Sequence, residues 1–227
     1  MDLYNQKDKS YPQKIILTVL ELIIIAVSYW ILFEKGYSRI FQPANPGEGN
    51  IVRHIILFSF NIIVFLRILV TTFYLIQRKM PWEEAFSIPF AFALYYVGFA
   101  LLGYKATIDI GPVEYSGIAL FLLGSFLNTG SEMARDSWKK DPDNKGRLYT
   151  SGLFKYSMHI NYFGDLLWVS AYAFVTRNWY SVLIPVFLFC FFAFYNIPKL
   201  DKYLKSKYGD QFDDYQKRTS RFIPFIY

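Results

Sequence analysis

The chain has 227 residues, of which 54% are hydrophobic, 21% aromatic and 19% charged, and its formal net charge is +6. This share of aromatic and apolar residues is far above the average for soluble domains and excludes disorder, a coiled coil and an ordinary water-soluble enzyme. The one cysteine, Cys190, excludes a disulfide framework and a cysteine-ligated zinc site. No metal site is therefore expected, and Cys190 is expected to be a packed core thiol.

Six apolar blocks follow one another along the chain. A helix rises about 1.5 Å per residue, so roughly 20 apolar residues cross the hydrocarbon core of a bilayer. The expected spans are Ile15–Phe33, Ile55–Ile76, Ala85–Tyr104, Val113–Asn128, Asn161–Thr176 and Tyr180–Ile197. The short break between the last two predicts a tight hairpin. The sequence thus predicts an all-α, polytopic transmembrane helical bundle of about six spans, a single membrane domain over residues 1–227 with four spans in 1–130.

The basic residues predict the orientation of this bundle. With six spans both termini lie on the same side of the membrane, and that side carries 18 Lys and Arg residues against five on the other. By the positive-inside rule the richer side is cytoplasmic. We therefore expect an integral, multi-pass membrane protein with cytoplasmic N- and C-termini, whose charges meet membrane lipids and not nucleic acid. The tail after residue 197 is basic but ends in aromatic and aliphatic residues, which predicts a cytosolic tail docked on the bundle.

The first three spans contain the candidates for catalysis. Glu21 is the lone charge of the first span, and Arg67 interrupts the second. A charge at membrane depth is costly and indicates a function, although a structural pair between Glu21 and Arg67 is an equally open interpretation. Tyr95 and Tyr96 in the third span are possible hydrogen-bond donors to a substrate.

A polar stripe follows the fourth span. Asn128, Glu132, Arg135 and Lys139 are spaced i, i+4, i+7 and i+11, which places them on one face of a helix that continues out of the membrane. The stripe offers an amide, a carboxylate and two cations to a ligand. The same pattern is also typical of a solvated helix face that is held by charge pairs.

A second polar group lies at the start of the fifth span. Asn161 and Asp165 are four residues apart and share a helix face, with Tyr162 beside them, and Arg147 lies in the loop before them. Gly164 would let another helix or a ligand approach the backbone closely. Because a short loop returns the chain to the same place, we expect one ligand to be shared by this group and the Asn128 stripe.

The C-terminal region resembles a known family. Residues 152–156 read Gly-Leu-Phe-Lys-Tyr and lead into Asn-Tyr-Phe-Gly-Asp at 161–165. The tail then contains, in order, Tyr203-Leu204, Tyr208, Tyr215 and the ending Ile-Pro-Phe-Ile-Tyr. These motifs resemble the signature of the steroid 5-alpha-reductase family, which includes the bacterial domain of unknown function 1295 proteins. The resemblance implies that residues 131–227 form a reductase-like region, which consists of a cofactor loop, a helical hairpin and the tail.

The resemblance implies a membrane enzyme that uses NADPH to reduce a carbon–carbon double bond conjugated to a carbonyl in a lipid or steroid-like molecule. By matching positions it implies cofactor contacts from Asn128, Glu132, Arg147, Asn161, Asp165 and Tyr203. Arg135 and Lys139 lie near the family's basic positions, and Tyr162 lies within the matched motif. The chain departs from the family in two respects. The family often has Glu where Asp165 stands, and tail positions that hold His in the animal enzymes are not His here, since the residues before Tyr203 are Lys199, Leu200, Asp201 and Lys202.

The residue types suit NADPH independently of the resemblance. Its phosphates require cations, and arginine binds phosphate in a bidentate way. Its ribose hydroxyls and carboxamide require amides and carboxylates, which the two polar groups contain. No Gly-x-Gly-x-x-Gly lies between a strand and a helix, so a dinucleotide would bind inside the bundle and not in a Rossmann fold.

Two alternatives remain open at this point. Isoprenylcysteine carboxyl methyltransferases bind S-adenosylmethionine at a similar C-terminal site, with the signature Arg-His-Pro-x-Tyr. Residues 158–162 read Met-His-Ile-Asn-Tyr, so the His and Tyr are present but the Arg and Pro are absent. S-adenosylmethionine also has no phosphates to require the cations. The second alternative is a non-catalytic membrane scaffold protein.

Overall fold

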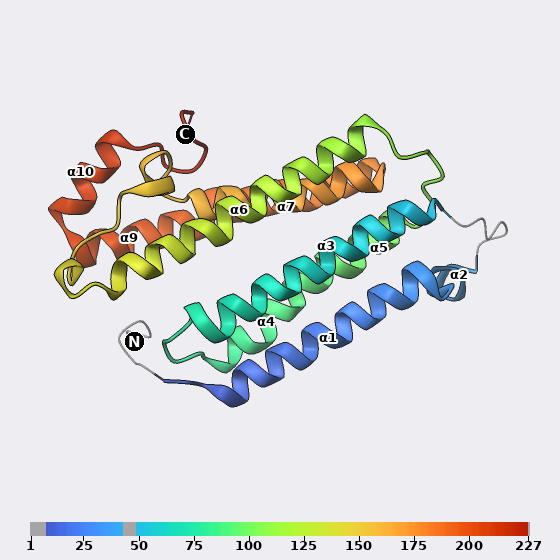
Figure 1. The fold of residues 1–227 in the computed structure, drawn as a ribbon, viewed down its shortest axis with the longest axis horizontal. Helices are drawn as coiled ribbons and strands as arrows, with labels where there is room; N and C mark the ends of the chain where they lie inside the picture. Colours follow the sequence, from blue (N-terminus) through green and yellow to red (C-terminus); the bar gives the residue numbers. More distant parts are fainter. Residues whose placement is uncertain (1–7, 43–48, 227) are drawn as a thin grey trace. The chain divides into compact units, whose positions relative to one another are not determined.

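The computed structural model describes residues 8–42 and 49–226, and no β-strand occurs within them. The helices are α1 (Tyr11–Phe33), α2 (Gly36–Phe41), α3 (Ile51–Val70), α4 (Trp82–Ala93), α5 (Phe99–Gly103), α6 (Pro112–Lys140), α7 (Ile160–Thr176), α8 (Leu183–Phe191), α9 (Ile197–Tyr208) and α10 (Asp210–Arg218) (Figure 1). Three π-helical turns continue α3, α4 and α8, namely Thr71–Leu75, Leu94–Gly98 and Phe192–Asn196. The all-α prediction is confirmed.

Among the described residues, four segments are long and apolar enough to cross a membrane: Tyr11–Phe33, Ile51–Leu75, Trp82–Gly103 and Trp179–Tyr208. Large apolar side chains lie on their outer surfaces, for example Phe90 at 83% and Phe194 at 76% exposure, as expected for helices that face lipid. The protein is thus an integral membrane protein. The other two expected spans correspond to α6 and to α7, which has 17 residues, and the count of six stays a prediction.

The chain divides into two compact units. Unit 1 comprises Met1–Ile118 and Tyr172–Ile184, and unit 2 comprises Ala119–Ala171 and Pro185–Tyr227. In unit 1, α1 packs against α3 and α4, and these helices run side by side (Figure 1). Its interior is built from fully buried apolar side chains such as Leu17, Leu57 and Phe99. Burial of each such side chain stabilises the fold by about 1.5–3 kcal/mol.

A buried arginine closes one end of unit 1. Arg53, in the first turn of α3, is 0% exposed, and its Nη2 donates to Oε1 of Glu114 at 2.7 Å. Its remaining donors bond to three backbone carbonyls, those of Val175 at 2.7 Å and of Ala106 and Ile108 at 2.8 Å. Glu114 also accepts a hydrogen bond from Nε of Arg177 at 2.7 Å. One guanidinium thereby connects the start of α3, the loop before α6, the start of α6 and the end of α7.

In unit 2 two glycines let α6 and α7 approach at backbone distance. A Cβ on Gly164 would lie 2.5 Å from the amide nitrogen of Asn128, and a Cβ on Gly124 would lie 2.5 Å from that of Trp168. Real Cβ atoms do not approach other atoms so closely, so only glycine fits at both positions. The predicted role of Gly164 in a close helix contact is confirmed, and this contact brings the polar residues of the two helices together.

The C-terminal tail is docked on unit 2, as predicted. The amide of Met158 donates to the carbonyl of Ser220 at 2.8 Å, and the Ser157 hydroxyl donates to that of Phe222 at 2.7 Å. Phe222 is completely buried, whereas Phe225 is 83% exposed, so the burial ends before Phe225. Tyr227, part of the sequence motif, lies outside the described residues.

The prediction for Cys190 is wrong. Its side chain is exposed on α8 instead of packed in a core. In a membrane helix the outward face meets hydrocarbon that is as apolar as a protein interior. Apolar neighbours in the sequence therefore cannot distinguish an inward from an outward position.

Candidate functional site

Four of the predicted polar residues meet between α6 and α7 in unit 2. Nδ2 of Asn161 donates to Oε1 of Glu132 at 2.8 Å, and Nδ2 of Asn128 donates to the carbonyl of Asn161 at 3.3 Å. The Arg135 guanidinium donates to the other Glu132 oxygen. We call Asn128, Glu132, Arg135 and Asn161 the amide–carboxylate cluster. All four side chains are half-buried, so the cluster is ordered yet open to a ligand.

Cations gather beside this cluster. Desolvation by the surrounding protein, followed by repulsion from Arg135 and Lys207, lowers the pKa of Lys139 from 10.5 to about 8. Glu132 and Asp136 act in the opposite direction but do not compensate for these effects. Lys207 comes from α9 and was not among the predicted site residues, because only the docked tail brings it near α6. Three cations in one place destabilise each other, and an anionic ligand would relieve that repulsion.

The other predicted cofactor residues have different partners. Tyr162 stacks on Phe192 with ring centroids 4.6 Å apart, and Oδ1 of Asp165 accepts a hydrogen bond from the Trp168 indole at 2.7 Å. The Tyr203 hydroxyl accepts one from Lys207 at 3.2 Å. The Arg147 side chain is exposed. The structure therefore joins Tyr203 to the cations through Lys207, while Asp165 bonds within its own helix.

The tail contributes to a cluster of ionisable residues that the sequence did not indicate, in which His159 and Asp201 are buried and Arg221 is half-buried. Nε2 of His159 hydrogen-bonds to Oδ1 of Asp201 at 2.7 Å, and Nε of Arg221 donates to Oδ2 of Asp201 at 2.7 Å. His159 also stacks on Tyr162, with centroids 5.7 Å apart. These contacts fix the tail and hold the Tyr162 ring. The three ionic residues are far apart in the sequence, and no local spacing links them.

Two of the predicted catalytic candidates meet in the interior of unit 1. Glu21 of α1 and Tyr96 of the π-helical turn Leu94–Gly98 are both 0% exposed. They interact electrostatically with each other. Within the described residues, neither oxygen of the Glu21 carboxyl group nor the Tyr96 hydroxyl has a partner at hydrogen-bond distance. Buried polar groups without partners are costly, and they are found where a ligand or a reaction uses them.

A chain of hydrogen bonds crosses the same interior. The Tyr172 hydroxyl donates to Oδ1 of Asn61 at 2.9 Å, and Nδ2 of Asn61 donates to the Ser28 hydroxyl at 2.8 Å. All three side chains are fully or almost fully buried. The only sequence signal was Asn61, an amide that interrupts an apolar block.

The remaining two candidates are placed differently. Arg67 is half-buried and interacts electrostatically with Tyr96 and Tyr172, and the Glu21 carboxyl group forms no hydrogen bond with it. The expected alternative of a Glu21–Arg67 pair is therefore wrong. Tyr95 is 9% exposed and packs edge-on against Phe92 at 5.4 Å.

These features define a class of protein. It is a helical membrane protein that has buried acidic and phenolic groups in one unit and clustered amides and cations in the other. The family model described as "Protein of unknown function (DUF1295)" matches residues 79–219. The chain belongs to this steroid 5-alpha-reductase-like family. The match begins well before the region in which the sequence motifs were recognised.

Named relatives differ in how much of the chain they cover. A 3-oxo-5-alpha-steroid 4-dehydrogenase 1 of Rattus norvegicus is 27% identical over 203 residues, which is 87% of this chain and 74% of that protein. The Delta(14)-sterol reductase erg24 of Schizosaccharomyces pombe is 28% identical over 53% of this chain and 32% of its own length. The Probable O-methyltransferase ustE of Ustilaginoidea virens is 33% identical over 40% of this chain and 33% of its own length. The chain thus spans about a third of the length of the latter two. By their names, the first two are oxidoreductases.

Proposed function

We propose that this chain is a membrane-embedded, NADPH-dependent reductase of a carbon–carbon double bond conjugated to a carbonyl in a lipid or steroid-like molecule. The observation that carries the proposal is the buried Glu21–Tyr96 pair, in a chain whose family includes steroid dehydrogenase and sterol reductase relatives. The apolar helices support a lipophilic substrate that enters from the membrane. The positive-inside rule further supports cytoplasmic termini.

Reduction of an enone adds a hydride to one carbon and a proton to the neighbouring carbon, and negative charge develops on the carbonyl oxygen meanwhile. A preorganised hydrogen-bond donor at that oxygen lowers the barrier. The Tyr96 hydroxyl is a donor that has no partner within the described residues, and the adjacent Glu21 carboxyl group would orient it. Because both are completely buried, water does not compete for them.

The residues of unit 2 suit the cofactor in number and charge. Arg135, Lys139 and Lys207 would hold its phosphates, and their mutual repulsion supports an anionic ligand there. The amides and carboxylate of Asn128, Asn161 and Glu132 would bind its ribose hydroxyls and carboxamide. When bound, NADPH supplies the hydride for the reduction.

The main alternative is an S-adenosylmethionine-dependent methyltransferase, which the similarity to the O-methyltransferase relative favours. The clustered cations argue against it, since that cofactor carries no phosphate and is itself a cation. A non-catalytic scaffold protein is the remaining alternative. A cofactor-binding experiment distinguishes the reductase from the methyltransferase, and an enone reduction assay distinguishes the reductase from the scaffold protein.

We expect the purified protein in detergent to bind NADPH more tightly than S-adenosylmethionine in isothermal titration. Replacing Asn161 by Ala removes a hydrogen bond from the proposed site, and replacing Arg147 by Ala removes an exposed charge that the family resemblance assigns to the cofactor. Each change should weaken NADPH binding by roughly tenfold. Lys217→Ala is the matched control, because Lys217 is exposed and pairs with Asp214 on α10. Its NADPH affinity should remain that of the wild type.

Three results would contradict this proposal. Binding of S-adenosylmethionine without binding of NADPH would favour the methyltransferase. Unchanged NADPH affinity in both the Asn161 and Arg147 variants would show that NADPH does not bind at the proposed site. NADPH binding without oxidation by any enone in an extracted lipid pool would favour the scaffold protein.

The affinity for NADPH should also depend on pH through Lys139. Since the pKa of this ammonium is lowered to about 8, it is charged at pH 7 and mostly neutral at pH 9. Binding of a phosphate-bearing ligand should therefore weaken by about tenfold as the pH rises across this interval. Titrations at several pH values measure this. In Lys139→Arg, whose side chain stays charged, the dependence should disappear; an identical profile in that variant would exclude Lys139 as its source.

A further inference from the structure

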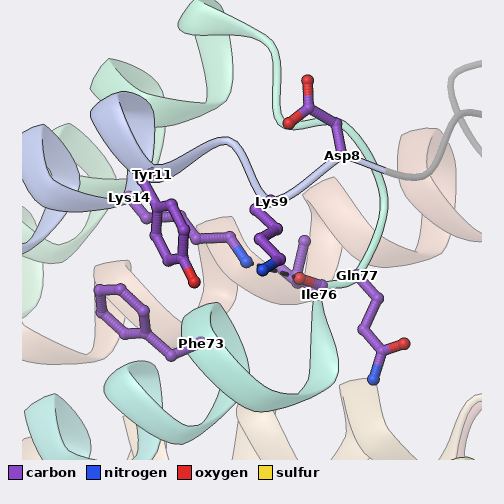
Figure 2. Close-up of a pocket in the computed structure, with 7 residues that line it drawn as sticks. All are labelled: Asp8, Lys9, Tyr11, Lys14, Phe73, Ile76 and Gln77. Carbon is purple, nitrogen blue, oxygen red and sulfur yellow. Dashed lines mark hydrogen bonds between the residues drawn. The ribbon is translucent and has the colours of Figure 1, made fainter.

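A cavity of about 380 Å³ lies in unit 1, where the chain enters α1. Its lining consists of Asp8, Lys9, Tyr11, Lys14, Phe73, Ile76 and Gln77 (Figure 2). The volume falls within the range of roughly 300–1,000 Å³ that is usual for ligand pockets. None of these residues belongs to the sites proposed above for the cofactor or the reaction.

Two lysines, Lys9 and Lys14, line this cavity (Figure 2). The Lys14 ammonium lies beside the carbonyl of Ile76 (Figure 2). Lys14 is only 4% exposed, and it donates to that carbonyl at 2.7 Å. This bond uses one of the three N–H groups of the ammonium, so donors remain for a ligand. Two lysine side chains that line one cavity favour an anionic ligand there.

The backbone around the lysines is firmly built. The Ser10 hydroxyl accepts a hydrogen bond from the amide of Met80 at 3.0 Å, and both residues are buried. Oδ1 of Asp8 accepts one from the amide of Ser10 at 2.8 Å. The Asp8 carboxylate closes this turn and is turned away from Lys14 in Figure 2, and its attraction compensates only part of the cost of burying that ammonium.

The cavity lies at the level where lipid headgroups are expected. Helix α1 has 23 residues, which at about 1.5 Å each give roughly 35 Å, so its two ends reach the two membrane surfaces. The cavity is at the end where α1 begins and where the span Ile51–Leu75 finishes. Tyr11 and Phe73 are about half exposed there, as aromatic residues at a membrane interface are.

We propose that this cavity binds the phosphate group of an anionic ligand, with the Lys9 and Lys14 ammonium groups as its cations and Tyr11 and Phe73 flanking it. Lysine is a common point-charge binder of phosphate. The position at the membrane surface favours the headgroup of an anionic phospholipid over a soluble phosphate. Such a site would fix the start of α1 to the surrounding leaflet.

The test compares lipid binding by native mass spectrometry of the detergent-solubilised protein. The wild type should bind phosphatidylglycerol more tightly than phosphatidylcholine. Each lysine contributes roughly fivefold at a membrane surface, so Lys9→Gln with Lys14→Gln should weaken the tightest phosphatidylglycerol binding by about 30-fold. Lys105→Gln is the matched control. Lys105 lies over the ring of Tyr37 in unit 1, as Lys9 lies over the ring of Tyr11.

Two further variants keep the test valid if the double variant does not fold. Lys9→Gln alone changes an exposed side chain and should cost about fivefold. Lys14→Arg retains the charge and should keep most of the affinity. In a parallel measurement, glycerol 3-phosphate replaces the lipid; lysine-dependent binding of this probe with none of the lipid would identify a soluble phosphate as the ligand. Equal binding by the wild type and Lys9→Gln, or lysine-dependent binding of neither probe, would overturn the proposal.

Discussion

Replacing Tyr96 by Phe should lower the rate of enone reduction by about 10²–10³-fold, because loss of one donor to a developing oxyanion has a cost of this size. The ring remains in place and only the hydroxyl is lost; within the described residues this hydroxyl is at hydrogen-bond distance from no protein group, and its loss removes the electrostatic contact with Glu21. Folding and NADPH affinity should therefore stay near the wild type. The measurement is kcat with an enone lipid, alongside titration of NADPH.

Glu21→Gln tests the other member of the pair. The amide keeps the volume of the carboxyl group but changes its donors and acceptors, so kcat should fall while NADPH affinity is retained. Tyr95→Phe is the matched control, because Tyr95 is the adjacent buried tyrosine and packs edge-on against Phe92. A loss of activity in Tyr95→Phe equal to that in Tyr96→Phe would assign the effect to packing and would contradict the proposed role of Tyr96.

The Glu21–Tyr96 pair illustrates what periodicity can and cannot predict. Each residue was a candidate on its own, because a charge or a phenol in an apolar block is unusual. Their meeting depends on how α1 and the π-helical turn Leu94–Gly98 pack, and no local spacing encodes this. By contrast, Glu132 and Arg135 lie on one helix, so their spacing alone predicted a shared face, and their ion pair agrees with it.

The same distinction holds for the cations. Lys139 was predicted from the helical stripe, but Lys207 reaches it only because the tail docks. The tail docks through the contacts of Asp201 with His159 and of Phe222 with Ser157. Apolar blocks predict helices well because length and hydropathy are local properties. The direction in which a helix faces is not local when lipid and protein are equally apolar, which is why Cys190 was misplaced.

Replacing Arg53 by Gln should have the largest effect on folding. The guanidinium is 0% exposed and is hydrogen-bonded to Glu114 and to three backbone carbonyls from two separate parts of the chain. Its removal takes a donor from each of these carbonyls, of which that of Ala106 still accepts from the Asn50 amide at 3.0 Å, and Glu114 loses a buried partner. Breaking a buried ion pair costs about 3–5 kcal/mol, which is a large part of the total stability of a domain.

Thermal unfolding in detergent should show this loss as a fall in Tm of roughly 10 °C or more, or as aggregation on expression. Arg177→Gln is the matched control: it removes another arginine from the same carboxylate, but Arg53 and the amide of Gly111 still bond to Glu114. Its fall in Tm should be clearly smaller. The Tm of Arg53→Lys should lie between the Tm values of Arg53→Gln and Arg177→Gln. An ammonium restores the charge but cannot reach four acceptors in the planar geometry of a guanidinium. A wild-type Tm in Arg53→Gln would mean that these carbonyls find other donors, and that the end of unit 1 does not depend on this residue.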